Sequence, residues 1–319
     1  MIPSPGILFA LITTLCWAIG IFPFTQAARR LGVNSLNHFR LVLAAFSIGL
    51  IALLKGGETF FTLFSPLYSD AWLWVSLSGI IGLAIGDYFT FAMFSIMGPR
   101  IGSVLTTLAP AAALISGALL VDEQISMIGI LGIFITIAGV NFISLAKSER
   151  SKIPNLGHGT ITWGITAGIL ASICQGVGLV FARKGLLAQR LVQELDPLHA
   201  SFIRLSSAAI SLTLFALLTG KFASLLRPII TNRNGGIRYA LAGTLFGPVL
   251  GVSIALYAIA LIDPSVAQTI FSLVPAVAFI ISAIVYKEKL TLVSILGLIV
   301  AILGVVVLIW RKQIGSLFS

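Results

Sequence analysis

Ten apolar runs, each close to twenty residues long, occupy most of the chain. They cover about residues 6–27, 33–54, 71–94, 99–121, 125–146, 159–186, 197–219, 236–259, 264–286 and 290–311. A helix needs about twenty apolar residues to cross the hydrocarbon of a bilayer. The runs are continuously apolar and do not alternate, which favours helices over a transmembrane barrel. The sequence therefore predicts an all-α integral membrane protein with ten transmembrane helices.

Charged residues are too few to cover a water-facing surface. They make up 9% of the chain, whereas a soluble domain carries about 25%. The net charge is +10, but the 20 Lys and Arg residues lie mostly in short breaks between apolar runs, as is usual beside membrane helices. This placement argues against a nucleic-acid partner. The chain has no Walker A motif, CxxC pair or histidine cluster, so we expect no cofactor, no metal and no direct use of ATP.

The second half of the chain repeats the first. A shift of 165 residues, the separation of Gly82 from Gly247, aligns 79–146 with 244–311 without a gap. The shift pairs residues that rarely match by chance, namely Gly82 with Gly247, Gly86 with Gly251, Pro99 with Pro264, Pro110 with Pro275 and Glu123 with Glu288; with small gaps, Arg40 pairs with Arg204. We place the two repeats at 1–152 and 153–319. Each holds five spans, and an odd number makes them cross the membrane in opposite directions, an arrangement common in secondary transporters.

These features resemble the EamA branch of the drug/metabolite transporter superfamily. The resemblance rests on the paired arginines early in each second helix, the prolines in each fourth helix, the acidic turns at 121–124 and 286–289, and the Gly-Val pairs at 139–140 and 304–305. It covers essentially the whole chain. It implies a ten-helix transporter and favours export, but it does not name a substrate.

Asp87 is the residue that the repeat does not explain, because its counterpart is Val252. A carboxylate at mid-bilayer costs about 2.5–3.5 kcal/mol on insertion scales, and such residues usually face a cavity or a partner. Asp87 is almost the only carboxylate within the apolar runs. We expect it to contact substrate or exchange a proton; the alternative is a hydrogen bond to a neighbouring helix.

Seven further residues with polar or aromatic side chains are candidates for the substrate site. They are Trp17, Gln26, Tyr88, Thr106, Gln175, Tyr257 and Gln268. Together they form a largely neutral, amphipathic set. Such a set suits a substrate that has both polar and apolar parts.

The paired residues are candidates for structural or gating roles. Gly82, Gly86, Gly247 and Gly251 form two GxxxG motifs, which let helices pack closely or pivot. Pro110 and Pro275 bend their helices, as hinges or as passive kinks. Arg40 and Arg204 either extend to the membrane surface or attract an anion or lock the halves together. Glu123 and Glu288 are expected to cap helix N-termini.

The leading hypothesis is a secondary transporter that moves a small organic metabolite by alternating access. We expect an amino acid or a similar amphipathic compound, driven by a proton gradient or by its own gradient. A passive channel or lipid scramblase, and a membrane-embedded enzyme, are the alternatives. We expect a multi-pass protein of a bacterial inner membrane. The side that the termini face, the coupling ion and the oligomeric state stay open.

Overall fold

The computed structural model describes residues 4–65, 68–145, 158–188, 195–286, 292–311 and 314. Seven helices in this part are long and apolar enough to cross a membrane, and three shorter apolar helices lie at 106–120, 127–142 and 295–309. Their positions match the ten apolar runs. The ten-helix prediction is therefore confirmed.

The first repeat folds into five spans. The first two are α1 (Pro5–Leu31) and α2 (Val33–Thr62). The third combines α3 (Ser69–Ser78), the π-helix η2 (Gly79–Gly86) and the start of α4 (Asp87–Leu105), which breaks at Gly98, where φ is +80°. The fourth runs through the end of α4, the 3-10 turn η3 (Thr106–Leu108) and α5 (Ala109–Leu120), and the fifth is α6 (Met127–Leu145).

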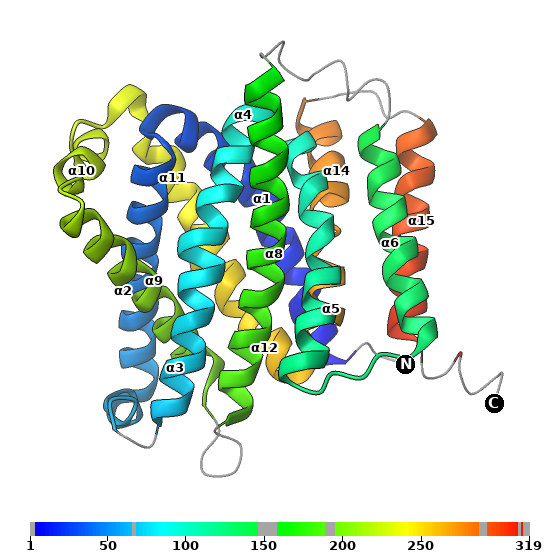
Figure 1. Cartoon of the computed structure of the whole chain (residues 1–319), viewed down its shortest axis with the longest axis horizontal. Coiled ribbons are helices and arrows are strands. Elements are labelled where there is room, and N and C mark those ends of the chain that lie inside the picture. Colours follow the sequence, from blue (N-terminus) through cyan, green and yellow to red (C-terminus); the bar gives the residue numbers. More distant parts are fainter. Residues whose placement is uncertain are drawn as a thin grey trace.

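The second repeat has the same plan. Its spans are α8 (His158–Ala188), α9 (Pro197–Leu218), the series α11 (Ile237–Thr244), η5 (Leu245–Val252) and α12 (Ser253–Leu261), the pair α13 (Pro264–Phe271) and α14 (Val274–Tyr286), and α15 (Leu292–Ile309). Figure 1 shows α1 and α8 running in opposite directions, as an inverted repeat requires. The expected repeat boundary at 152/153, and Glu288, lie outside the described residues.

A π-helix interrupts the third span of both repeats at matching positions. In η5 the cause is visible in the sequence, because Pro248 lies inside it and has no N–H to donate. In η2 the three glycines Gly79, Gly82 and Gly86 allow the altered backbone, because glycine adopts conformations that other residues avoid. A local π-helix leaves carbonyl groups without a helical partner, and such bulges are frequent at functional sites.

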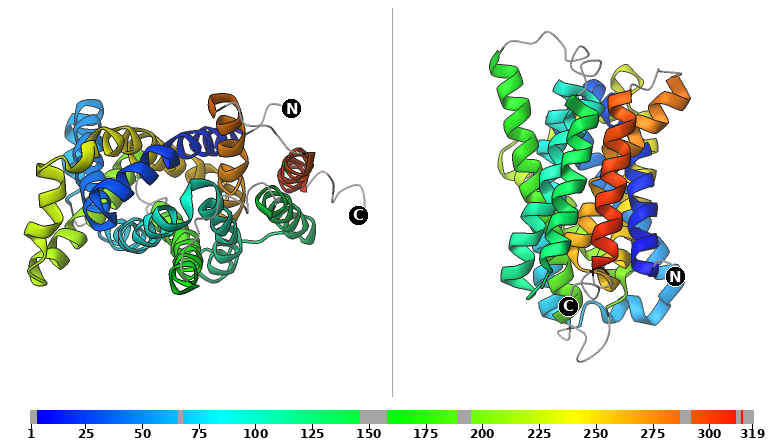
Figure 2. Two further views of the ribbon diagram at one scale, coloured as in Figure 1. Left: turned by 90° about the horizontal axis from the view of Figure 1, so that it is seen from above. Right: turned by 90° about the vertical axis from the view of Figure 1, so that its right-hand side faces the viewer.

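The repeats interlock through their first and third helices. Helix α1 packs against α11, η5 and α12 of the second repeat, and α8 packs against α3, η2 and α4 of the first. The fifth helices, α6 and α15, pair with each other at one end of the molecule (Figure 2). Added Cβ atoms at Gly139 and Gly304 would lie 2.3 Å and 2.4 Å from backbone nitrogens of the facing helix, so this contact requires glycine.

One segment that lies between two of the predicted spans is also helical. Residues 222–230 form α10 (Phe222–Ile230), which lies at one face of the molecule and buries none of its residues (Figure 1). Its apolar residues Phe222, Leu225, Leu226 and Ile229 recur at helical spacing. This short amphipathic pattern is too brief to be read as a membrane span.

Candidate functional site: a cavity between the repeats

A central cavity lies between the two repeats. It holds about 860 Å³ of space free of protein atoms, part of which is open to solvent. Its walls come from α1, α2, η2, α4, η3, α5, α8, η5, α13 and α14. The lining residues belong to both halves, so a movement of one repeat against the other changes the cavity.

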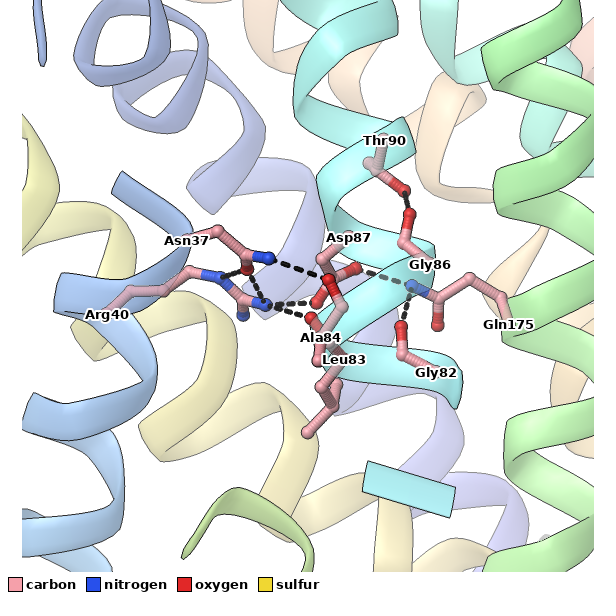
Figure 3. Close-up of polar contacts among 9 residues, drawn as sticks. All are labelled: Asn37, Arg40, Gly82, Leu83, Ala84, Gly86, Asp87, Thr90 and Gln175. Carbon is pink, nitrogen blue, oxygen red and sulfur yellow. Dashed lines mark hydrogen bonds and ion pairs between the residues drawn. The ribbon is translucent and has the colours of Figure 1, made fainter. Parts of the chain in front are cut away.

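Asp87 lies at the polar end of this cavity. It is the first residue of α4, directly after η2, and is 9% exposed. Its carboxylate forms an ion pair with Arg40 of α2. The side-chain amide of Gln175 on α8 donates to Asp87 Oδ1 over 2.5 Å (Figure 3). Asp87 therefore connects a helix of the first repeat with one of the second.

The same network satisfies the carbonyl groups of η2. Gln175 Nε2 also donates to Gly82 O (3.3 Å), Arg40 Nη2 to Leu83 O (3.1 Å) and Asn37 Nδ2 to Ala84 O (2.8 Å). Asn37 Oδ1 in turn accepts from Arg40 Nε (3.1 Å) and Nη2 (2.9 Å). Buried carbonyl groups need such donors. Asn37 escaped the sequence analysis, although its position three residues before Arg40 places both on one face of α2.

Arg204 of α9 is buried against η2. Like Arg40 it is 2% exposed, which excludes an extension of either arginine to the membrane surface. Its Nη2 lies 3.0 Å from the position of a Cβ added to Gly82, and its charge interacts with Asp87. Within the part of the chain that the structure describes, its Nε has no hydrogen-bond partner. Two buried cations therefore accompany Asp87.

The rest of the cavity wall is mostly aromatic and apolar, with four polar side chains, Thr90, Thr106, Gln268 and Ser272, among its residues. Trp17 and Phe271 meet edge to face with ring centroids 4.8 Å apart, and Phe24 and Phe91 lie 5.0 Å apart. The guanidinium of Arg40 lies 4.9 Å from the Phe91 ring centroid, a cation–π contact. The cavity thus has one charged end and one aromatic side.

The structure brings five of the eight predicted substrate contacts to this cavity: Trp17, Asp87, Thr106, Gln175 and Gln268. The other three lie elsewhere. Gln26 is exposed, Tyr88 packs against Phe89, and Tyr257 donates to Asp196 over 3.2 Å. Tyr88 directly follows Asp87 in α4, and consecutive residues of a helix point in different directions, so Tyr88 does not face the cavity as Asp87 does. The ring residues Phe91, Phe94 and Phe271 line the cavity and were not singled out, because apolar residues are abundant in every span.

The paired glycines lie where helices approach closely. A Cβ added to Gly86 would lie 2.9 Å from Cys174 Cβ on α8, whereas Cβ atoms at Gly247 and Gly251 would meet the Phe24 and Trp17 rings of α1 at 2.5 Å and 2.3 Å. The two GxxxG motifs therefore pack against the first helix of the opposite repeat. This is the close packing expected of small residues.

The paired prolines each follow a break in the fourth span. Pro110 is the second residue of α5, directly after η3, and Pro275 is the second residue of α14, after the break at 272–273. Proline fits the first turn of a helix, where its missing N–H is not needed. Both breaks adjoin the cavity, which Ala109 and Val274 line.

Glu123 caps a helix of the other repeat. It follows α5, and its carboxylate accepts hydrogen bonds from Ser265 N (3.3 Å) and from Ser265 Oγ, at the N-terminus of α13. Burial raises the pKa of Glu123 from 4.5 to about 7, although the Ser265 hydrogen bonds oppose the shift. Asp263 raises this pKa further and Arg311 lowers it. The contact fastens the end of the fourth span in one repeat to the start of the fourth span in the other.

Comparison with known proteins gives the family. The EamA-like transporter family model matches residues 4–145 and 162–310. A protein of Bacillus subtilis (strain 168) described as "Uncharacterized transporter YyaM" is 27% identical over 291 residues, which cover 91% of this chain and 85% of that protein. A crystal structure with 16% sequence identity has the same fold, with a TM-score of 0.68 over 98% of this chain and 99% of that chain. Because the two family matches cover both five-helix halves, the chain belongs to the EamA-like transporter family.

Proposed function

We propose that this membrane transporter is a secondary carrier that moves a small organic metabolite by alternating access. The observation that carries the proposal is the cavity, which is bounded by both repeats and has one charged end and one aromatic side. Two inverted halves can exchange conformations, and the exchange turns a cavity open to one side into a cavity open to the other. The substrate is an amino acid or a similar amphipathic compound, and export is the favoured direction.

The test of a carrier is counterflow. The purified protein is reconstituted into proteoliposomes, which are filled with an unlabelled amino acid or left without it. Uptake of the same amino acid, labelled and added outside, is then measured in both preparations. A carrier gives faster uptake when substrate is present on the far side. Uptake that does not respond to substrate on the far side would indicate a pore or scramblase, which are the alternatives.

Asp87 is the proposed site of proton coupling. Its carboxylate is shared between Arg40 and Gln175, so protonation would weaken a link between the two repeats. Asp87→Asn is expected to abolish transport driven by a pH gradient while counterflow continues. Unchanged gradient-driven transport in this variant would exclude Asp87 as the coupling residue and leave the substrate's own gradient as the driving force.

A membrane-embedded enzyme is the weakest alternative. Metal-dependent catalysis at membrane depth needs several converging His, Asp, Glu or Cys ligands, and no such group occurs among the residues that the structure describes. The family is one of transporters.

A further inference from the structure

The cluster at the polar end of the cavity carries an excess positive charge. Arg40 and Arg204 are each 2% exposed, and Asp87 is the carboxylate between them. Two guanidinium groups and one carboxylate leave a net charge of about +1, since arginine keeps its proton in proteins. An uncompensated buried charge is costly and is normally paired.

The repeat explains the origin of this excess. Asp87 corresponds to Val252, and alignment of 16–20 with 174–178 pairs Trp17 with Gln175 and Gly20 with Gly178. Arg204 is therefore kept at the site related by the repeat. Val252, and Trp17 on α1 of the first repeat, stand there in place of the carboxylate and the amide that neutralise and orient Arg40. Throughout the described segments Arg204 forms no ion pair, and its Nε lacks a hydrogen-bond partner.

Arg40 is the member of the cluster that presents positive charge to the cavity. It lines the cavity, whereas Arg204 packs against η2 and is not among the lining residues. Arg40 uses Nε and Nη2 for Asn37, Leu83 and Asp87, while its Nη1 donates to none of the residues drawn in Figure 3. A ligand oxygen at this nitrogen would lie beside Asp87 and within the field of Arg204, and the ligand body would face Phe91 and the aromatic side.

We infer that the cavity takes a ligand with one net negative charge and an apolar body, such as an apolar carboxylate, whose anionic group binds Arg40. This inference rests on the proposed carrier function and narrows its substrate class. A monoanion brings the cluster to neutrality. A zwitterionic amino acid leaves the excess charge in place, so it binds less tightly than the carboxylate without the ammonium group.

Matched probes test the sign of the ligand charge. Phenylacetate, indole-3-acetate and hexanoate are each compared with the corresponding primary amide, and phenylacetate also with phenylalanine, by thermal unfolding of the full chain in nanodiscs. We expect at least one carboxylate to bind about tenfold or more tightly than its amide, because a charge-assisted hydrogen bond is lost in the amide. If no carboxylate binds better than its amide, including the case in which neither binds, the inference is wrong.

Two substitutions should change anion binding in opposite directions. Val252→Asp restores a carboxylate at the counterpart of Asp87 and is expected to weaken carboxylate binding about tenfold, with Val252→Asn as the uncharged control. Asp87→Asn removes the competing carboxylate and is expected to strengthen it. General damage to the fold would weaken binding in both variants, and that result would contradict the inference.

Counterflow separates this inference from the carrier function. If phenylalanine or the neutral amides exchange across proteoliposomes and the carboxylates do not, the chain is a carrier and the inferred ligand charge is wrong. If carboxylates bind selectively and no compound shows counterflow, the anion site stands and the proposed carrier function fails.

Discussion

In the first repeat, η2 is followed by Asp87 and faces Gln175 of α8; in the second, η5 ends at Val252 and faces Trp17 of α1. The π-helices, the glycines and the buried arginines occur on both sides. The shared features are those that let helices approach and bend. The features that differ, namely Asp87 against Val252 and Gln175 against Trp17, all line the cavity. The duplicated scaffold is therefore shared, whereas these lining groups have diverged.

The largest expected difference between the repeats concerns their arginines. Arg40→Met leaves the buried carboxylate of Asp87 without its ion-pair partner and is expected to destabilise the protein by about 3–5 kcal/mol. Arg204→Met removes a cation that has no ion pair among the described residues, so it is expected to be neutral or stabilising. Unfolding of both variants in nanodiscs measures the difference. Equal destabilisation would show that Arg204 is paired as firmly as Arg40.

The next effect depends on pH. Glu123 is protonated in folded and unfolded protein below about pH 4.5 and ionised in both above about pH 7. Between these values the folded protein holds the proton more tightly, so its stability falls as the pH rises, by about 3 kcal/mol in total. Glu123→Gln should flatten this slope. The midpoint of thermal unfolding is measured for both proteins at pH 4.5, 6 and 8. If the dependence on pH is unchanged in Glu123→Gln, groups other than Glu123 cause it.

A smaller effect should distinguish two matched glycines. A Cβ added to Gly178 would lie 2.9 Å from Gly82 Cα, whereas one added to its counterpart Gly20 would lie 3.5 Å from Gly247 N. Gly178→Ala is therefore expected to cost about 1–3 kcal/mol through overpacking. Gly20→Ala should be tolerated, since 3.5 Å is an ordinary contact. The two variants are compared by unfolding at one pH. A larger loss of stability for Gly20→Ala would show that Gly20, and not Gly178, lies at the tighter helix contact.

The smallest effect lies at the start of the second helix of each repeat. Asp196 caps α9 by accepting from Leu198 N at 2.7 Å, while Gly32, its counterpart before α2, has no side chain to do so. Burial raises the pKa of Asp196, but the Leu198 N–H and Lys55 outweigh this and hold it below the ordinary value. Asp196→Ala should lower the free energy of unfolding by about 1 kcal/mol. Asp196→Asn should lower it much less, because asparagine also caps a helix N-terminus.

That pair of variants also measures the surface ion pair. Lys55 Nζ lies 3.2 Å from Asp196 Oδ2, and both side chains are more than one third exposed. Exposed pairs contribute about 0–1 kcal/mol. A loss in Asp196→Asn as large as that in Asp196→Ala would show that the charge, and not the cap, accounts for the stability.

Sequence reasoning succeeded for residues whose role depends on local pattern. The glycine and proline pairs were found because they recur at one shift, and Asp87 was found because a carboxylate is rare in an apolar run. It did not separate Tyr88, Gln26 and Tyr257 from the cavity residues, because they share polarity with those residues but face other directions. It also missed Asn37, whose contacts with Ala84 depend on how α2 is rotated against η2.

The sequence by itself determined the number of spans, the duplication and the opposed directions of the halves. Span length follows from the thickness of the bilayer, and an odd number of spans in each repeat leaves no other arrangement. Only the tertiary structure decided that Asp87 pairs with Arg40 of its own repeat, bonds Gln175 of the other and leaves Arg204 without an ion pair in the described part of the chain. Arg40 and Asp87 are 47 residues apart on different helices. Their meeting depends on the depth and rotation of each helix, which are fixed by side-chain packing and not by apolar periodicity.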